Sequence, residues 1–142
     1  MFIVGEHAQR SFDSLAATTR APGGGFTLHL GTRNMASAGF VVSTYPDRTS
    51  RIRAASFNPR DIRRFIAGNQ TCLDLPGRHL GAWHNEETGL VELDITIVAP
   101  DQARAVLLGV TYGQKAVYDL SAQQEIRLEH MRLNDHFPDL VA

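Results

Sequence analysis

The chain has 142 residues, of which 43% are hydrophobic and 20% are charged, a mixture typical of one compact folded domain rather than a disordered chain. The formal net charge of -1 gives no global attraction to nucleic acid or anionic lipid. The single cysteine, Cys72, excludes an intrachain disulfide framework and a cysteine-based zinc site, and it favours a reducing compartment. No apolar run is long enough to span a membrane, and Met1–Gly5 lacks the basic flank of a signal peptide, so we expect neither an anchor nor a leader.

The first part of the chain is weakly patterned. Ser11 is a suitable N-cap for a short helix, but three glycines follow at 23–25 and favour irregular backbone. We therefore expect residues 1–25 to form an arm or a loosely docked segment. Residues 26–128 should form a single domain, and residues 129–142 a C-terminal tail.

Three strands are expected next, at 26–30, 39–45 and 51–57. The first alternates apolar and polar residues, and the second is rich in β-branched and aromatic residues. In the third, Ile52 lies on one side, and Arg51 and Arg53 lie on the other. These patterns are typical of strands that bury one face.

A helix is expected to begin at Asn58. Its side chain can accept hydrogen bonds from free backbone N–H groups, and Pro59 is well suited to the first helical position. Gly68 and Asn69 offer a stop. The apolar stripe of this helix consists of Ile62, Phe65 and Ile66.

The clearest pattern is a hairpin from His79 to Val98. If residues 86–89 form the turn, Asn85 faces Leu90, and the register of every earlier pair follows. A slip of one residue would turn the whole aliphatic set to the wrong side, so this register is well specified. The expected core face carries Leu80, Ala82, His84, Val91, Leu93, Ile95 and Ile97. The outer face carries His79, Gly81, Trp83, Glu92, Asp94 and Thr96.

A second helix is expected after Pro100, with Asp101 at its positive end and Gly113 as its left-handed stop. Two more strands are expected at 116–120 and 125–128. The predicted fold is α+β: a mostly antiparallel sheet of five to seven strands with two helices packed on one face. The buried stripe of the second helix should be Ala103, Val106, Leu107 and Val110.

The hairpin and the residues after it resemble a segment of small uncharacterised proteins of actinobacterial phages and prophages. The pattern is G-x-W, a turn with T-G, V-x-L-D-[VI], a short helix, N-Q-x-A-[IV]-x-D-L, and E-[EI]-I. The matching residues are Gly81, Trp83, Thr88, Gly89, Val91, Leu93, Asp94, Ile95, Gln114, Ala116, Val117, Asp119, Leu120, Glu125 and Ile126. Gly113 departs from the usual Asn. The resemblance implies a phage origin and the host cytoplasm, but no reaction.

Two sets of residues are candidates for function. The first is a cluster of six arginines within seventeen residues, which could meet phosphates or an acidic protein surface, or could simply be solvated: Arg48, Arg51, Arg53, Arg60, Arg63 and Arg64. The second is the outer hairpin face, where His79, Trp83, Glu92 and Asp94 could combine acid–base groups with a stacking ring. The alternative is that Trp83 packs under a helix and the carboxylates face solvent. The histidine spacings give no metal site, and no cofactor motif is present.

Three functions are compatible with these observations. The leading hypothesis is a phage-encoded binding protein that engages a host protein or ribonucleoprotein complex, such as an inhibitor of a host defence complex. Nucleic-acid contact through the arginine cluster is part of this hypothesis. The second is an enzyme acting on a nucleotide or modified base through the outer hairpin face, although no catalytic constellation is evident. The third is a virion or assembly component, and the oligomeric state is left open.

Overall fold

The computed structural model describes residues 11–128. They form one seven-stranded antiparallel sheet with helices on its outside, so the predicted α+β fold is confirmed. The strands are β1 (Gly25–Leu28), β2 (Phe40–Ser43), β3 (Ser50–Arg53), β4 (Arg78–Asn85), β5 (Leu90–Ala99), β6 (Ala116–Asp119) and β7 (Gln124–Arg127). The helices are α2 (Phe12–Arg20), α3 (Pro59–Gly68), α4 (Gln70–Leu73) and α5 (Gln102–Thr111), with short 3-10 turns η1 (Pro46–Arg48) and η2 (Ala54–Ser56).

Strand β5 is the centre of the sheet, whose order is β1-β4-β5-β2-β6-β7. One edge of β5 pairs with β4, and its other edge pairs first with β3 and then with β2. The hairpin register is the predicted one, because Asn85 pairs with Leu90 and Trp83 with Glu92. The alternation of the sequence therefore sets which residues of the hairpin reach the core.

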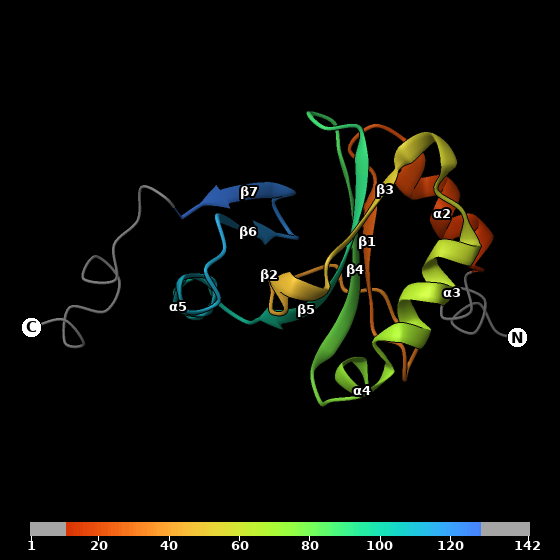
Figure 1. The fold of residues 1–142 in the computed structure, drawn as a ribbon. Helices are drawn as coiled ribbons and strands as arrows, with labels where there is room; N and C mark the ends of the chain where they lie inside the picture. Colours follow the sequence, from red (N-terminus) through yellow and green to blue (C-terminus); the bar gives the residue numbers. More distant parts are fainter. Residues whose placement is uncertain (1–10, 129–142) are drawn as a thin grey trace, which may run out of the picture.

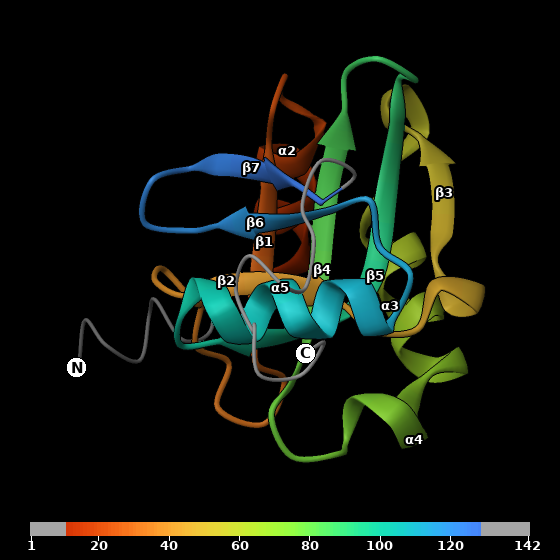
Figure 2. The same ribbon diagram turned by 90° about the vertical axis from the view of Figure 1, so that its left-hand side faces the viewer.

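The sheet bends so strongly that it has two limbs (Figures 1 and 2). The first limb comprises β1, β4, β3 and the first half of β5, with α2 and α3 on one side. The second limb comprises β2, β6, β7 and the end of β5, and α5 covers its outer side. In Figure 1, β6 and β7 lie on the side of the first limb opposite α2 and α3. The helices are thus outside the bend, and the other sheet face lies inside it.

Each limb has its own hydrophobic core. The core of the first limb consists of Leu15, Ala16, Phe26, Leu28, Phe57, Ile62, Phe65, Leu73, Leu80, Ala82, Val91, Leu93 and Ile95. The core of the second limb consists of Val42, Ala99, Ala105, Val106, Val117 and Leu128. The predicted pair of helices is therefore divided, with α3 covering the first limb and α5 the second.

Helix α3 begins as predicted. Asn58 accepts from the backbone N–H of Arg60 at 2.8 Å, and Asp61 accepts from the backbone N–H of Asn58 at 3.0 Å. This reciprocal cap satisfies donors that a helix start leaves free. Ile62 and Phe65 are buried against the sheet, while Ile66 is half-buried.

The expectation of an N-terminal arm or loosely docked segment is wrong for the described part of residues 1–25. Helix α2 is capped by Ser11, as predicted, but it buries Leu15, Ala16 and Thr19 completely. Arg20 also donates to the carbonyl of Phe57 at 2.6 Å. The buried stripe contains one small and one polar residue, so its apolar pattern is weak. Residues 1–10 and the predicted tail at 129–142 lie outside the described residues.

The predicted stripe of the second helix is also wrong in part. Asp101 caps α5 and Gly113 adopts φ 66°, as expected. The buried residues, however, are Ala105, Val106 and Gly109, and Val110 is exposed. A Cβ on Gly109 would lie 2.5 Å from Cδ1 of Leu128, so the helix turns its smallest residues to the sheet and approaches closely.

Candidate functional site on the concave sheet face

The inner side of the bend is a continuous sheet face whose members follow from the strand register. Trp83 on β4 pairs with Glu92 on β5. Further along β5 on the same face, Val98 pairs with Val41 on β2, which in turn pairs with Tyr118 on β6. Because paired residues project to the same side of a sheet, Trp83 and Tyr118 share this face although they belong to different limbs. We call it the concave face.

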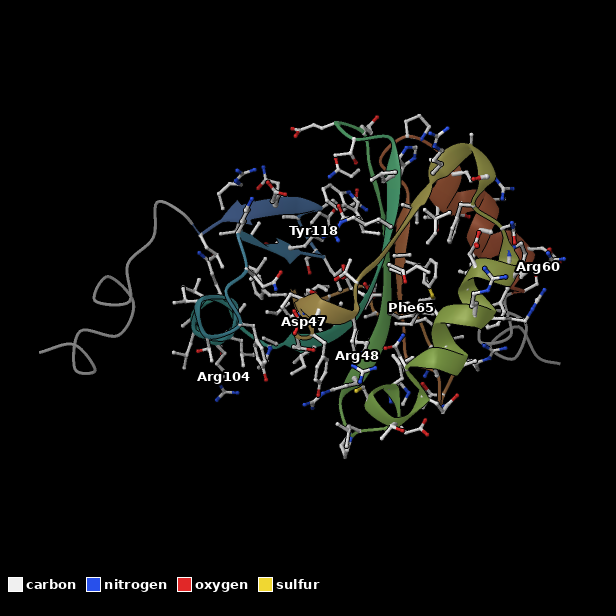
Figure 3. All side chains as sticks on the ribbon, viewed as in Figure 1. Asp47, Arg48, Arg60, Phe65, Arg104 and Tyr118 are labelled. Carbon is white, nitrogen blue, oxygen red and sulfur yellow. The ribbon has the colours of Figure 1, made fainter. Side chains whose placement is uncertain are left out.

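Two aromatic side chains on the concave face are open to solvent. Trp83 is 43% exposed and Tyr118 is 38% exposed. Gly25 stands beside Trp83 on β1 and has no side chain to cover it. Figure 3 shows Tyr118 between β6 and the hairpin. One interpretation of the sequence placed Trp83 under a helix, but in the structure no helix covers it.

Two carboxyl groups lie between the aromatic residues, and they differ in environment. Asp94 is partly buried and accepts from the hydroxyl of Thr49 at 2.6 Å. Burial raises the pKa of Asp94, and the hydrogen bond from Thr49 opposes that increase in part. Glu92 accepts from Nδ2 of Asn85 at 3.2 Å and lies 3.9 Å from a guanidinium nitrogen of Arg51. Its negative charge adds to the increase in the pKa of Asp94.

His79 occupies the same face but lies beyond the carboxyl groups, where it pairs with Thr96. Its Nδ1 lies 3.2 Å from the carbonyl oxygen of Gly77, and its ring meets that of His29 edge-on, with 5.3 Å between centroids. Burial lowers the pKa of His79, which favours the neutral imidazole. The structure thus joins Trp83, Glu92 and Asp94 and places His79 in a separate histidine pair. Among residues 11–128, no group of three or more potential ligands is arranged for a metal ion.

The arginine cluster is divided between two surfaces. Arg51 and Arg53 pair with Glu92 and Leu90, so they belong to the concave face. The arginines of α3 lie on the helix that packs against the opposite face; they are Arg60, Arg63 and Arg64. Arg48 donates to Oδ1 of Asn69 at 3.0 Å, and Figure 3 shows it well apart from Arg60. The chain crosses from one face to the other at η2, so neighbours in sequence separate in space.

Sequence reasoning missed Tyr118 and Thr49. The alternation in β6 already indicated that Tyr118 faces away from Val117, but it did not indicate that β6 pairs with β2. Thr49 is the single residue between η1 and β3, in a connection where the sequence has no periodic pattern. Asp119, at the end of β6, caps the turn that follows, because its Oδ1 accepts from the backbone N–H of Ala122 at 3.1 Å.

Comparison with protein-family models gives no match, and comparisons with curated proteins and with solved structures give no significant match. None of the helices within the described residues combines the length and the apolar character needed to cross a lipid bilayer.

Proposed function

We propose that this chain is a binding protein that engages another protein through its concave face. The observation that carries the proposal is the exposure of Trp83 and Tyr118 on one face, beside Arg51 and Arg53. Tryptophan, tyrosine and arginine are the residue types that dominate the energy of protein interfaces. Removal of this exposed indole surface from water by a partner would be favourable.

The charges of the concave face favour a protein over a nucleic acid. Glu92 and Asp94 lie between the aromatic residues and would repel a phosphate backbone. The three arginines of α3 lie on the opposite surface, so their positive charge does not offset this repulsion. A protein partner can present both basic and acidic side chains to this mixed surface.

The proposed kind of partner rests on the resemblance to phage and prophage proteins noted in the sequence. It supports a protein of a bacterial host, met in the host cytoplasm, as the target. Inhibition of a host defence complex is the role we propose, because a small chain that only binds can act by blocking the surface of a larger assembly.

The proposal is tested by affinity capture from host lysate after nuclease treatment, with three versions of the chain. The double variant W83A/Y118A should lose the captured protein, since truncated aromatic contacts at an interface centre typically cost about 2 kcal/mol or more each. The charge reversal R51E/R53E should weaken capture as well. The matched control R60E/R64E makes the same charge change on the opposite surface and should capture normally. If the aromatic variant captures as well as the native chain, the concave face is not the interface.

A second candidate is an enzyme that acts on a nucleotide or modified base, and the carboxyl pair favours it. Burial raises the pKa of Asp94, whereas the neighbouring Glu92 lies beside the positive charge of Arg51. Two carboxyl groups in such different environments can serve as a general acid and a general base. Trp83 could stack the substrate ring. Turnover of a panel of nucleosides and nucleotides that disappears in D94N would support this function, whereas equal turnover in D94N would remove it. The role of virion component stays a prediction.

A further inference from the structure

A pocket of about 330 Å³ lies on the convex side of the molecule, away from the concave face. Its lining residues come from the start of α2, the loop after β1, α3 and the first residue of α4. We call the apolar side chains of the lining, Phe12, Leu30 and Ile66, its floor, and the two arginines, Arg33 and Arg63, its rim. An apolar floor with a few convergent polar groups is the usual composition of a small-molecule site.

Arg33 is held in an unusual backbone conformation. Its φ is 62°, in the left-handed region that non-glycine residues rarely occupy. The surrounding loop fixes it: the N–H of Arg33 donates to the carbonyl of His29 at 2.7 Å, and the N–H of His29 donates to the carbonyl of Asn34 at 2.9 Å. The N–H of Thr32 donates to Nδ1 of His29 at 3.1 Å. Strain retained by such a network is characteristic of functional positions.

The side chain of Arg33 contacts another residue of the pocket. Its guanidinium carbon lies 4.9 Å from the centroid of the Phe12 ring, a distance at which the positive charge and the ring attract each other. Among the described residues, no carboxylate lies within ion-pair distance of either Arg33 or Arg63. The rim therefore carries two positive charges that residues 11–128 do not neutralise.

We infer that this pocket binds a small organic anion in which a phosphate or carboxylate group is joined to an aromatic or apolar body. The two guanidinium groups, which come from the loop and from α3, would hold the anionic group, because their planar donors match its oxygens. The body would lie on Phe12 and Ile66. The volume suits a molecule no larger than a mononucleotide. The inference is independent of the protein partner proposed for the concave face.

The test uses phenyl phosphate as the probe and follows binding to the full chain by calorimetry and by amide chemical shifts. Inorganic phosphate alone and phenol alone are the two comparison probes. Phenyl phosphate should bind at least about tenfold more tightly than either, because it engages rim and floor together. Equal affinity for phenyl phosphate and inorganic phosphate would overturn the inference, since it would show that the floor contributes nothing.

Variants locate the site. R63M should weaken binding of phenyl phosphate at least about tenfold, whereas R64M, with the same charge change on the same helix outside the pocket, should change it by less than about twofold. A67L keeps both arginines but fills the pocket, so it should also abolish binding. Equal effects of R63M and R64M, or native binding by A67L, would show that the anion binds elsewhere. A melting curve of each variant separates loss of the site from loss of the fold.

Discussion

The two limbs of the sheet are built from the same strand, β5, but their cores are of different kinds. Among residues 11–128, the first limb buries thirteen core residues, including Phe57 and Phe65, between α2, α3 and the hairpin. Within the same range the second limb buries six core residues, none larger than leucine, and α5 comes close to the sheet through Gly109. The first is stabilised by large apolar side chains, and the second depends on close backbone approach.

The first limb should be the more stable of the two, and the second limb should be the more adaptable. Buried apolar area is the main source of folding free energy, so the first limb should be the part that opens last. The second limb has fewer buried contacts and should open more readily. Trp83 belongs to the first limb and Tyr118 to the second. The concave face therefore combines residues of the limb that should open last with residues of the limb that should open more readily. Three groups of substitutions follow, from the largest expected effect to the smallest; the first two test this contrast, and the third tests the titration of Asp94 on the concave face.

Leu93→Ala should have the largest effect. Leu93 is fully buried in the first core, and truncation of such a leucine costs about 2–5 kcal/mol through lost burial and the cavity left behind. The measurement is the free energy of unfolding from urea denaturation. Val106→Ala in the second core is the control and should cost less, because it removes fewer buried atoms. A loss below about 1 kcal/mol for Leu93→Ala would contradict the dominance of the first core.

Gly109→Ala and Gly68→Ala should have effects of opposite sign. A Cβ at 109 would lie 2.5 Å from Cδ1 of Leu128 and 2.9 Å from Cγ1 of Val117, so overpacking should cost about 1–2 kcal/mol. At 68, nothing lies within 4 Å, and alanine should stabilise α3 by about 0.5–1 kcal/mol.

Thermal unfolding gives the change in stability of both glycine variants, and amide hydrogen exchange shows which strands Gly109→Ala affects. We expect faster exchange in β6 and β7 than in β1 and β4. Stabilisation by Gly109→Ala would show that α5 has room to move away from the sheet, and the proposed close packing would then not hold.

The pH dependence of Asp94→Asn should be the smallest effect. Because the pKa of Asp94 is raised on folding, the folded chain binds more protons than the unfolded chain between the ordinary value of about 3.9 and the raised value. The native chain therefore loses stability as the pH rises through that interval. Asparagine can still accept from Thr49 but does not ionise, so the variant should gain stability relative to the native chain as the pH increases. The check is the difference in unfolding free energy between about pH 3.5 and about pH 7. A difference that is independent of pH would show that Asp94 titrates normally.

The hairpin could be predicted in detail because aliphatic residues alternate with polar ones along most of β5, and this alternation fixes its register. The same holds for α3, whose cap and stripe are explicit in Asn58, Asp61 and Phe65. The buried stripe of α5 could not be predicted in this way. Hydrophobicity ranks Leu107 and Val110 above Gly109, whereas close packing against the sheet favours the smaller residue. The candidate site was predictable only on the hairpin. Tyr118 joins it through the pairing of β6 with β2, a contact between distant parts of the chain that local patterns do not encode.

The path of β5 through both limbs also limits how this protein can be divided or rearranged. A chain cut after Ala99 would lose α5, β6 and β7 together, and β2 would be left with a bare edge and with Val42 in water. Such an edge invites pairing with other chains. Neither limb can therefore be inherited or transplanted as a separate module. Insertions are best tolerated in the exposed turn between β4 and β5, where the backbone is free of core contacts.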